Sequence, residues 1–224
     1  MREYVGQMQT SFVPVHHPAE ELLHAYAAGT VTGARALIVA THLVYCPQCR
    51  AQVSAVESVG GEILDREDGH WAGECPDAPA AVPGSPALVC TGPDIDFAPR
   101  HLRTALEGSQ GKWNNVWFGV KELPIPHYGG AARLLWIPKG RRMPRHDHFG
   151  EEMTLVLTGS FSDATGRYRT GDFQTGAPGL DHQPWAGKDG PCVCLVVEQG
   201  GLKLSGWLGR LVEWRGGQSG TRAA

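Results

Sequence analysis

The chain has 224 residues, of which 42% are hydrophobic and 19% are charged, and its formal net charge is −3. This composition is typical of a soluble globular protein and excludes a disordered chain, while so small a negative charge provides no positive field to hold a nucleic-acid backbone directly. Residues 1–15 lack the basic start and apolar run of a secretory signal, and every apolar stretch is shorter than the roughly 20 residues of a membrane span. We therefore expect a cytoplasmic protein without membrane contact.

Three helices are expected in the N-terminal part of the chain. Apolar residues recur at helical spacing over residues 22–27 and 53–64, and residues 34–44 are rich in helix-forming side chains. Gly29 and Gly33 mark a turn between the first two helices. The pattern predicts a compact helical domain over residues 1–65.

Metal-ligating side chains cluster at the end of the second predicted helix. His42 and Cys46 are four residues apart and share a helix face, and the turn to Cys49 brings a second thiolate to the same point. Three histidines near the first helix are candidates for a fourth ligand: His16, His17 and His24. The alternatives are a redox pair of cysteines, although that motif follows a strand and none is predicted here, and a His42 that is simply solvated. Two Cys and two His predict structural or redox-labile zinc.

Residues 14–65 resemble the zinc-binding anti-sigma domain. The resemblance rests on the His-Pro start of the first helix, on Leu23, Tyr26 and Gly29, and on the His-x3-Cys-x2-Cys run. In that family a lone His precedes the run by about one helix-turn-helix length, which favours His17, 25 residues before His42 (42 − 17). The resemblance implies one Zn²⁺ ion with four ligands: His17, His42, Cys46 and Cys49. It also implies that the module binds an extracytoplasmic-function sigma factor and blocks its access to RNA polymerase core.

Helical periodicity ends near residue 66. Repeated prolines interrupt residues 66–99, which predicts a Pro-rich linker. A short helix is expected over residues 98–106, and beyond it short apolar segments alternate with Gly and Pro. The segments predicted as strands are 116–120, 132–137, 153–157, 192–198 and 202–207. Short strands at this spacing predict a β-barrel or sandwich over residues 100–216.

A second set of metal-ligating side chains lies in this β-rich half. His146 and His148 alternate along a strand and so face the same side of it, and Glu152 returns to that side farther along the chain. Together with Gly140 and Gly159, these residues fit the first cupin motif. A second motif should supply one more His from a neighbouring strand.

That second motif begins at Gly171, which precedes His182 by eleven residues, with Gly179 in its expected place. One position differs, because Ala177 stands where a proline is expected and Pro178 follows it. The resemblance to cupins covers residues 100–215 and implies a jelly-roll-like barrel whose metal has four ligands: His146, His148, Glu152 and His182. Such a donor set suits Zn²⁺, Mn, Fe or Ni.

Several further side chains near the barrel ligands have two interpretations each. Asp147 and Asp181 either orient the ligands or are exposed acids. Cys192 and Cys194 face the same side of one strand, as buried core residues or as sensing thiols. His101 has no companions and is expected at the surface. The barrel interior is expected to be apolar, with five residues near it in sequence: Leu134, Trp136, Leu155, Leu157 and Phe161.

The order of the two modules resembles that of the ChrR-type anti-sigma factors, as do the run of residues 132–138 and the Cys192-x-Cys194 pair. The predicted fold is α+β with two domains. The resemblance implies a non-enzymatic anti-sigma factor in transcription regulation, whose cupin senses an oxidative-type stress signal that leads to sigma release. The alternatives are a metal-dependent, oxygenase-like cupin enzyme with a helical interaction module, and a zinc-dependent protein with another partner.

Overall fold

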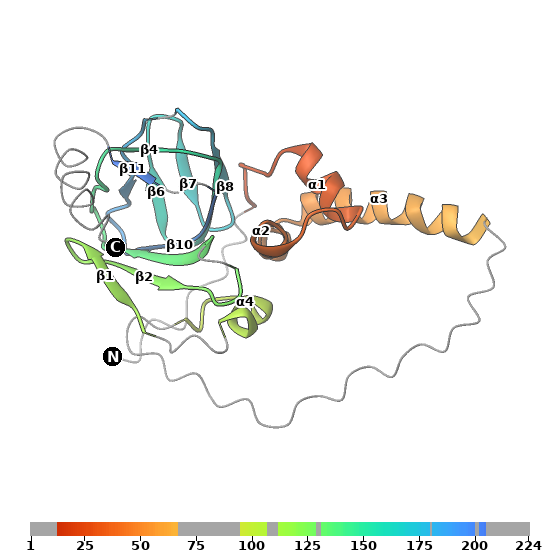
Figure 1. Ribbon diagram of the computed structural model, residues 1–224, viewed down its shortest axis with the longest axis horizontal. Helices are drawn as coiled ribbons and strands as arrows, with labels where there is room; N and C mark the ends of the chain where they lie inside the picture. Colours follow the sequence, from red (N-terminus) through yellow and green to blue (C-terminus); the bar gives the residue numbers. More distant parts are fainter. Residues whose placement is uncertain are drawn as a thin grey trace, which may run out of the picture.

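The protein consists of a helical module beside a β-barrel, as seen in a computed structural model (Figure 1). The structure describes residues 13–66, 95–106, 112–128, 131–179, 181–199 and 202–204. Most of the predicted linker, residues 67–94, and the end of the predicted barrel domain, residues 205–216, lie outside the described residues. Among the described helices, none is long and apolar enough to cross a membrane.

The helical module contains α1 (Glu20–Ala27), α2 (Gly33–Tyr45) and α3 (Pro47–Arg66), which confirms the three predicted helices. Gly29 and Gly33 have φ values of +70° and +61°, so the turn between α1 and α2 uses a backbone conformation that favours glycine. Pro47 is the first residue of α3, where a missing N–H is tolerated. The chain therefore turns sharply between α2 and α3, directly at Cys46.

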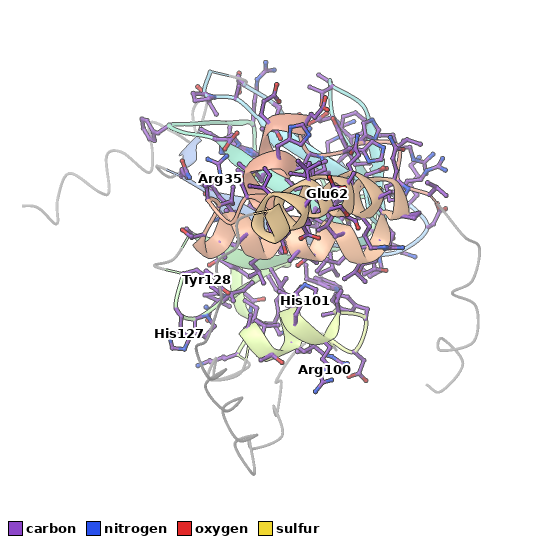
Figure 2. All side chains as sticks on the ribbon, turned by 90° about the vertical axis from the view of Figure 1, so that its right-hand side faces the viewer. Arg35, Glu62, Arg100, His101, His127 and Tyr128 are labelled. Carbon is purple, nitrogen blue, oxygen red and sulfur yellow. The ribbon has the colours of Figure 1, made fainter. Side chains whose placement is uncertain are left out.

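A fourth helix, α4 (Arg100–Ala105), lies below the helical module in Figure 2, which labels Arg100 and His101 on it. It confirms the short helix predicted over residues 98–106. Its Leu102 is fully buried, and His101 Nε2 lies 2.9 Å from Thr41 Oγ1 of α2. The prediction that His101 is a surface residue is wrong, because α4 packs this half-buried side chain against α2.

Eleven strands are described, in three antiparallel sheets. The largest sheet has the order β1-β2-β3-β10-β5-β8, and its strands are β1 (Asn114–Trp117), β2 (Val120–Pro124), β3 (Ala132–Ile137), β10 (Cys192–Glu198), β5 (Glu152–Thr158) and β8 (Phe173–Gly176). The second sheet pairs β11 (Leu202–Leu204) with β4 (His146–His148). The third has the order β7-β6-β9, from β7 (Arg167–Arg169), β6 (Ser160–Ser162) and β9 (Trp185–Ala186).

The central strands of the large sheet separate two apolar cores, because side chains alternate between the faces of a strand. On β10, Leu195 and Val197 face a core shared with the helices, whereas Cys194 and Val196 face the barrel interior. The first core also includes Ile38 of α2. The barrel and the helical module are thus joined by continuous apolar packing.

Three predicted strands are confirmed nearly to the residue, namely β3, β5 and β10. The strand predicted over residues 116–120 is wrong, since Phe118 and Gly119 have φ values of +35° and +87° and form a turn between β1 and β2. The predicted segment 202–207 is a strand over Leu202–Leu204, and its remainder lies outside the described residues. Strand β4 confirms that His146 and His148 alternate along a strand, whereas β6 to β9 were not predicted, because they are only two to four residues long.

Candidate metal centres

Four side chains from separate parts of the helical module converge on one point. His17 precedes α1, His42 is in the last turn of α2, and Cys46 and Cys49 flank the start of α3. Their ligand atoms all lie within 4.8 Å of one another. The His42 Nε2 to Cys49 Sγ distance is 3.3 Å, and His17 Nδ1 lies 3.4 Å from each sulfur. Tetrahedral zinc with ordinary bond lengths separates its ligand atoms by about 3.3–3.8 Å, so the spacing fits.

The other two histidine candidates are directed elsewhere. His16 Nδ1 lies 3.5 Å from a carboxylate oxygen of Asp172, in the barrel. His24 Nε2 lies 3.6 Å from Glu20 on the exposed face of α1. Among the described residues, therefore, His17 completes the cluster, as the resemblance implied.

The protonation states of this cluster follow from its hydrogen bonds and its burial. The Gly171 carbonyl oxygen lies 2.9 Å from His42 Nδ1 and can only accept, so Nδ1 carries the proton and the Nε2 lone pair faces Cys49. Burial lowers the pKa of His42 to about 4, which keeps the ring neutral. Burial, together with the neighbouring Cys46, raises the pKa of Cys49 to about 12. Buried thiols of this kind ionise when a metal supplies the compensating charge, and the donor set suits zinc.

The second cluster lies inside the barrel. His146 and His148 come from β4, Glu152 begins β5, and His182 is held beside His146 by two backbone hydrogen bonds of 3.0 and 2.9 Å. All four residues are buried, and their ligand atoms lie within 4.8 Å of one another. The structure thus brings together the four residues that the cupin motifs predicted.

The three imidazoles of this cluster are fixed in one tautomer by acceptors behind them. Nδ1 of His146 donates to the Pro144 carbonyl at 2.8 Å, Nδ1 of His148 to Glu198 at 3.2 Å, and Nδ1 of His182 to Asp163 at 3.0 Å. The Nε2 lone pairs therefore face one another, with His182 Nε2 only 3.1 and 3.2 Å from the other two. Lone pairs this close repel unless a cation lies between them, so the residues fit a metal.

The two carboxylates behind the histidines are ionised. Burial raises the pKa of Asp163, but hydrogen bonds from His182, Thr165 and Gln174 outweigh it and hold the pKa well below its usual range. Burial also raises the pKa of Glu198, but hydrogen bonds from His148 and Arg133 bring the net shift below the ordinary value. Each carboxylate therefore accepts from an imidazole N–H and increases the basicity of the nitrogen that faces the metal position.

The sequence did not identify Asp163 and Glu198, since they stand 19 and 50 positions from the histidines they orient. Asp147 instead accepts from the backbone N–H groups of His148 and Gly179, and so holds the segment around Gly179 against β4. Asp181 forms an exposed ion pair with Arg145. Two strands separate Asp163 from His182 and five separate His148 from Glu198, so neither acidic residue carries a spacing signal, whereas the aspartates next to the ligands do.

A cavity of about 320 Å³ adjoins the barrel cluster. Trp117, Leu135, Ile137 and Met143 supply much of its apolar wall, and His146, Glu152 and His182 lie at its polar end. Of the five residues expected near the interior, only Phe161 lines this cavity. Leu134, Trp136, Leu155 and Leu157 lie in or against the core on the opposite face of the sheet, and other side chains supply the expected apolar interior.

Cys192 and Cys194 face the barrel interior from β10, with their sulfurs 3.6 Å apart and both side chains buried. A hydrogen bond to Cys192, with burial, raises the pKa of Cys194 well above its ordinary value. Cys194 also lines the cavity. Both cysteines are therefore buried core residues, which agrees with the first of the two interpretations.

Comparisons with known proteins agree on both modules. The family described as the ChrR cupin-like domain matches residues 103–201, and a family described as a zinc finger matches residues 17–50. The anti-sigma-E factor ChrR of Cereibacter sphaeroides is 37% identical over 215 residues, which cover 88% of this chain and 96% of that protein. One chain of the crystal structure of Rhodobacter sphaeroides SigE in complex with the anti-sigma ChrR is 39% identical, with a TM-score of 0.64, and the match covers 82% of this chain and 98% of that one. The chain therefore belongs to the ChrR family of anti-sigma factors.

Proposed function

We propose that this protein is an anti-sigma factor that sequesters an extracytoplasmic-function sigma factor through its helical module. The observation that carries the proposal is the similarity to ChrR, which extends over both modules and includes a relative crystallised with SigE. The acid-rich helical module suits a basic, DNA-binding partner. Sequestration keeps the sigma factor from RNA polymerase core until a signal reverses it.

In this proposal the helical module is shaped by Zn²⁺ bound to His17, His42, Cys46 and Cys49. The ion joins the segment before α1 to the ends of α2 and α3, and so fixes the angles between short helices whose own core is small. Four protein ligands leave no open position, which makes the zinc structural. Its thiolates remain open to oxidation when the ion is lost.

The distal half of α3 offers a surface for the sigma factor. Val59 and Ile63 are each 58% exposed and lie four residues apart, on one stripe of a helix that extends away from the rest of the module (Figure 1). Glu62 is exposed beside them (Figure 2). An apolar stripe flanked by acid is the pattern of a helix that docks on a basic partner. We propose this stripe as part of the sigma contact.

The barrel is proposed as the sensing end, with a Zn²⁺, Mn, Fe or Ni ion held by His146, His148, Glu152 and His182. The ion would supply a Lewis-acidic position at the end of the apolar cavity, where an oxidative-type signal molecule or its product binds. Release of the sigma factor then requires that this event favour one state of the complex over another.

Co-expression with each extracytoplasmic-function sigma factor of the same genome tests the proposal. The full-length protein should co-purify with one of them in a stoichiometric complex, and Cys46→Ala or Cys49→Ala should abolish the complex. Cys192→Ala, which removes a thiol from the barrel core instead, should leave it intact. An additional Ile63→Glu variant should weaken the complex without changing the zinc content. If the wild-type protein binds no sigma factor, the proposal fails.

The cavity beside the barrel cluster also favours a second function, that of a metal-dependent cupin enzyme. A volume of about 320 Å³ accepts a small organic molecule. Turnover of such a molecule by the metal-loaded protein, abolished by His146→Ala, would support this function. Binding without turnover would support the sensor.

A further inference from the structure

The turn that joins β7 to β8, residues 169–173, belongs to the barrel but contacts the zinc-binding segment directly. It is anchored to the middle of β5 by hydrogen bonds of Val156, which accepts from Gly171 N at 2.8 Å and donates to Asp172 O at 3.1 Å. The turn therefore moves with the barrel sheet.

Asp172 in this turn has a side chain that is 0% exposed and receives hydrogen bonds from both modules. Oδ1 accepts from the backbone N–H of Val15 at 2.8 Å and of His16 at 3.0 Å, and Oδ2 accepts from Arg169 N at 2.8 Å. The next residue, Phe173, donates its N–H to the His16 carbonyl at 3.0 Å. The backbone directly before His17 is thus held to the barrel by three hydrogen bonds, two to the Asp172 carboxylate and one to the Phe173 N–H.

The same turn contacts the zinc ligand His42 directly. The Gly171 carbonyl accepts from Nδ1 of His42 at 2.9 Å, and the Phe173 ring meets the His42 ring edge-on with centroids 5.8 Å apart. Gly171 permits this approach, because its φ is +89° and a Cβ there would lie 2.7 Å from Pro14 Cγ. Both histidines of the zinc cluster are therefore oriented from the barrel, whereas both cysteines come from the α2–α3 corner.

We propose that the β7–β8 turn positions the zinc centre of the helical module, with Asp172 as its principal positioning residue. The proposal rests on the proposed zinc site. The turn would couple the barrel to the zinc site, since a change in the position of the turn would change the positions of His17 and His42. Hydrogen-bond partners behind metal ligands typically contribute about 10–100-fold to metal affinity.

Co²⁺ alone is a suitable probe for this proposal, because thiolate-to-cobalt charge-transfer absorption reports only a site with cysteine ligands. The metal-free full-length protein is titrated with Co²⁺. In Asp172→Asn the side chain keeps its shape but loses its charge and one acceptor oxygen, and we expect the dissociation constant of this site to rise by about tenfold or more. The d–d bands should also shift, because the tetrahedral geometry is altered. Asp189→Asn, which removes the same charge from an exposed barrel turn, should match wild type.

A second variant leaves Asp172 intact. Val15→Pro deletes one N–H that Asp172 accepts, at a side chain that is 65% exposed, and should weaken cobalt binding in the same direction. Val13→Pro, at a position that is 52% exposed, is the matched control. Circular dichroism identifies any variant that has not folded. Wild-type affinity and bands in both Asp172→Asn and Val15→Pro would overturn the positioning role, whereas absence of the charge-transfer band from the wild-type protein would overturn the zinc site itself.

Discussion

Replacing Gly171 with Ala tests whether the helical module and the barrel are one folding unit. The new Cβ would lie 2.7 Å from Pro14 Cγ and 2.9 Å from Tyr45 Cβ, and neither atom can rotate away. The φ of +89° is a further strain for any L side chain. A strained φ costs about 1–3 kcal/mol and a forced shift of packed groups about 1–3 kcal/mol more. We therefore expect Gly171→Ala to lower the free energy of unfolding by about 2–6 kcal/mol.

Gly179→Ala is the matched control, because its φ is +87° and nothing lies within 4 Å of the new Cβ. Gly179→Ala should lower the free energy of unfolding only by the cost of the strained backbone, about 1–3 kcal/mol. Urea denaturation of the metal-saturated proteins measures the difference, with ellipticity at 222 nm for the helices and tryptophan fluorescence for the barrel. In wild type the two signals should change together, and in Gly171→Ala the helical signal should be lost first. Equal stability of the two variants would refute the shared packing.

Three further predictions concern other contacts. Arg133→Met removes the guanidinium that pairs with the buried Glu198 and the partly buried Glu122, and it should destabilise the protein by about 3–5 kcal/mol. The control Arg141→Met, at an exposed position, should change stability little. Burial lowers the pKa of His101 below 6.5. The contribution of the neutral His101 ring to folding stability is therefore complete above pH 6.5 and declines as the pH falls through the folded-state pKa. NMR titration should find the His101 midpoint below 6.5, and a midpoint at or above 6.5 would contradict this prediction. Native mass spectrometry should count two metal ions per chain in wild type and one in His146→Ala. An unchanged count would contradict the proposed metal site in the barrel.

The ligands of both centres were predictable from sequence because each set contains a local spacing. His42, Cys46 and Cys49 surround one helix corner, and His146 and His148 alternate on one strand, so secondary structure alone brings them together. The choice of His17 needed the family resemblance, since adjacent His16 is equally near in sequence. The structure separates them, because His16 faces Asp172.

The faces of the central strands were not predictable in the same way. Strands β5 and β10 are buried on both sides, so their apolar residues do not alternate with exposed polar ones. Nothing in such a sequence says which of its side chains face the cavity. The contacts between modules are equally hidden, because the Asp172 carboxylate accepts from the backbone N–H of Val15, 157 positions away, and a backbone N–H carries no sequence signal.

The most direct test of the central claim is a transcription assay with purified RNA polymerase core and the extracytoplasmic-function sigma factor that co-purifies with this protein. Increasing amounts of the zinc-loaded full-length protein should abolish transcription at about one molecule per sigma factor, and Cys49→Ala should restore it. Full transcription in the presence of excess zinc-loaded wild-type protein would contradict the assignment of this chain as an anti-sigma factor.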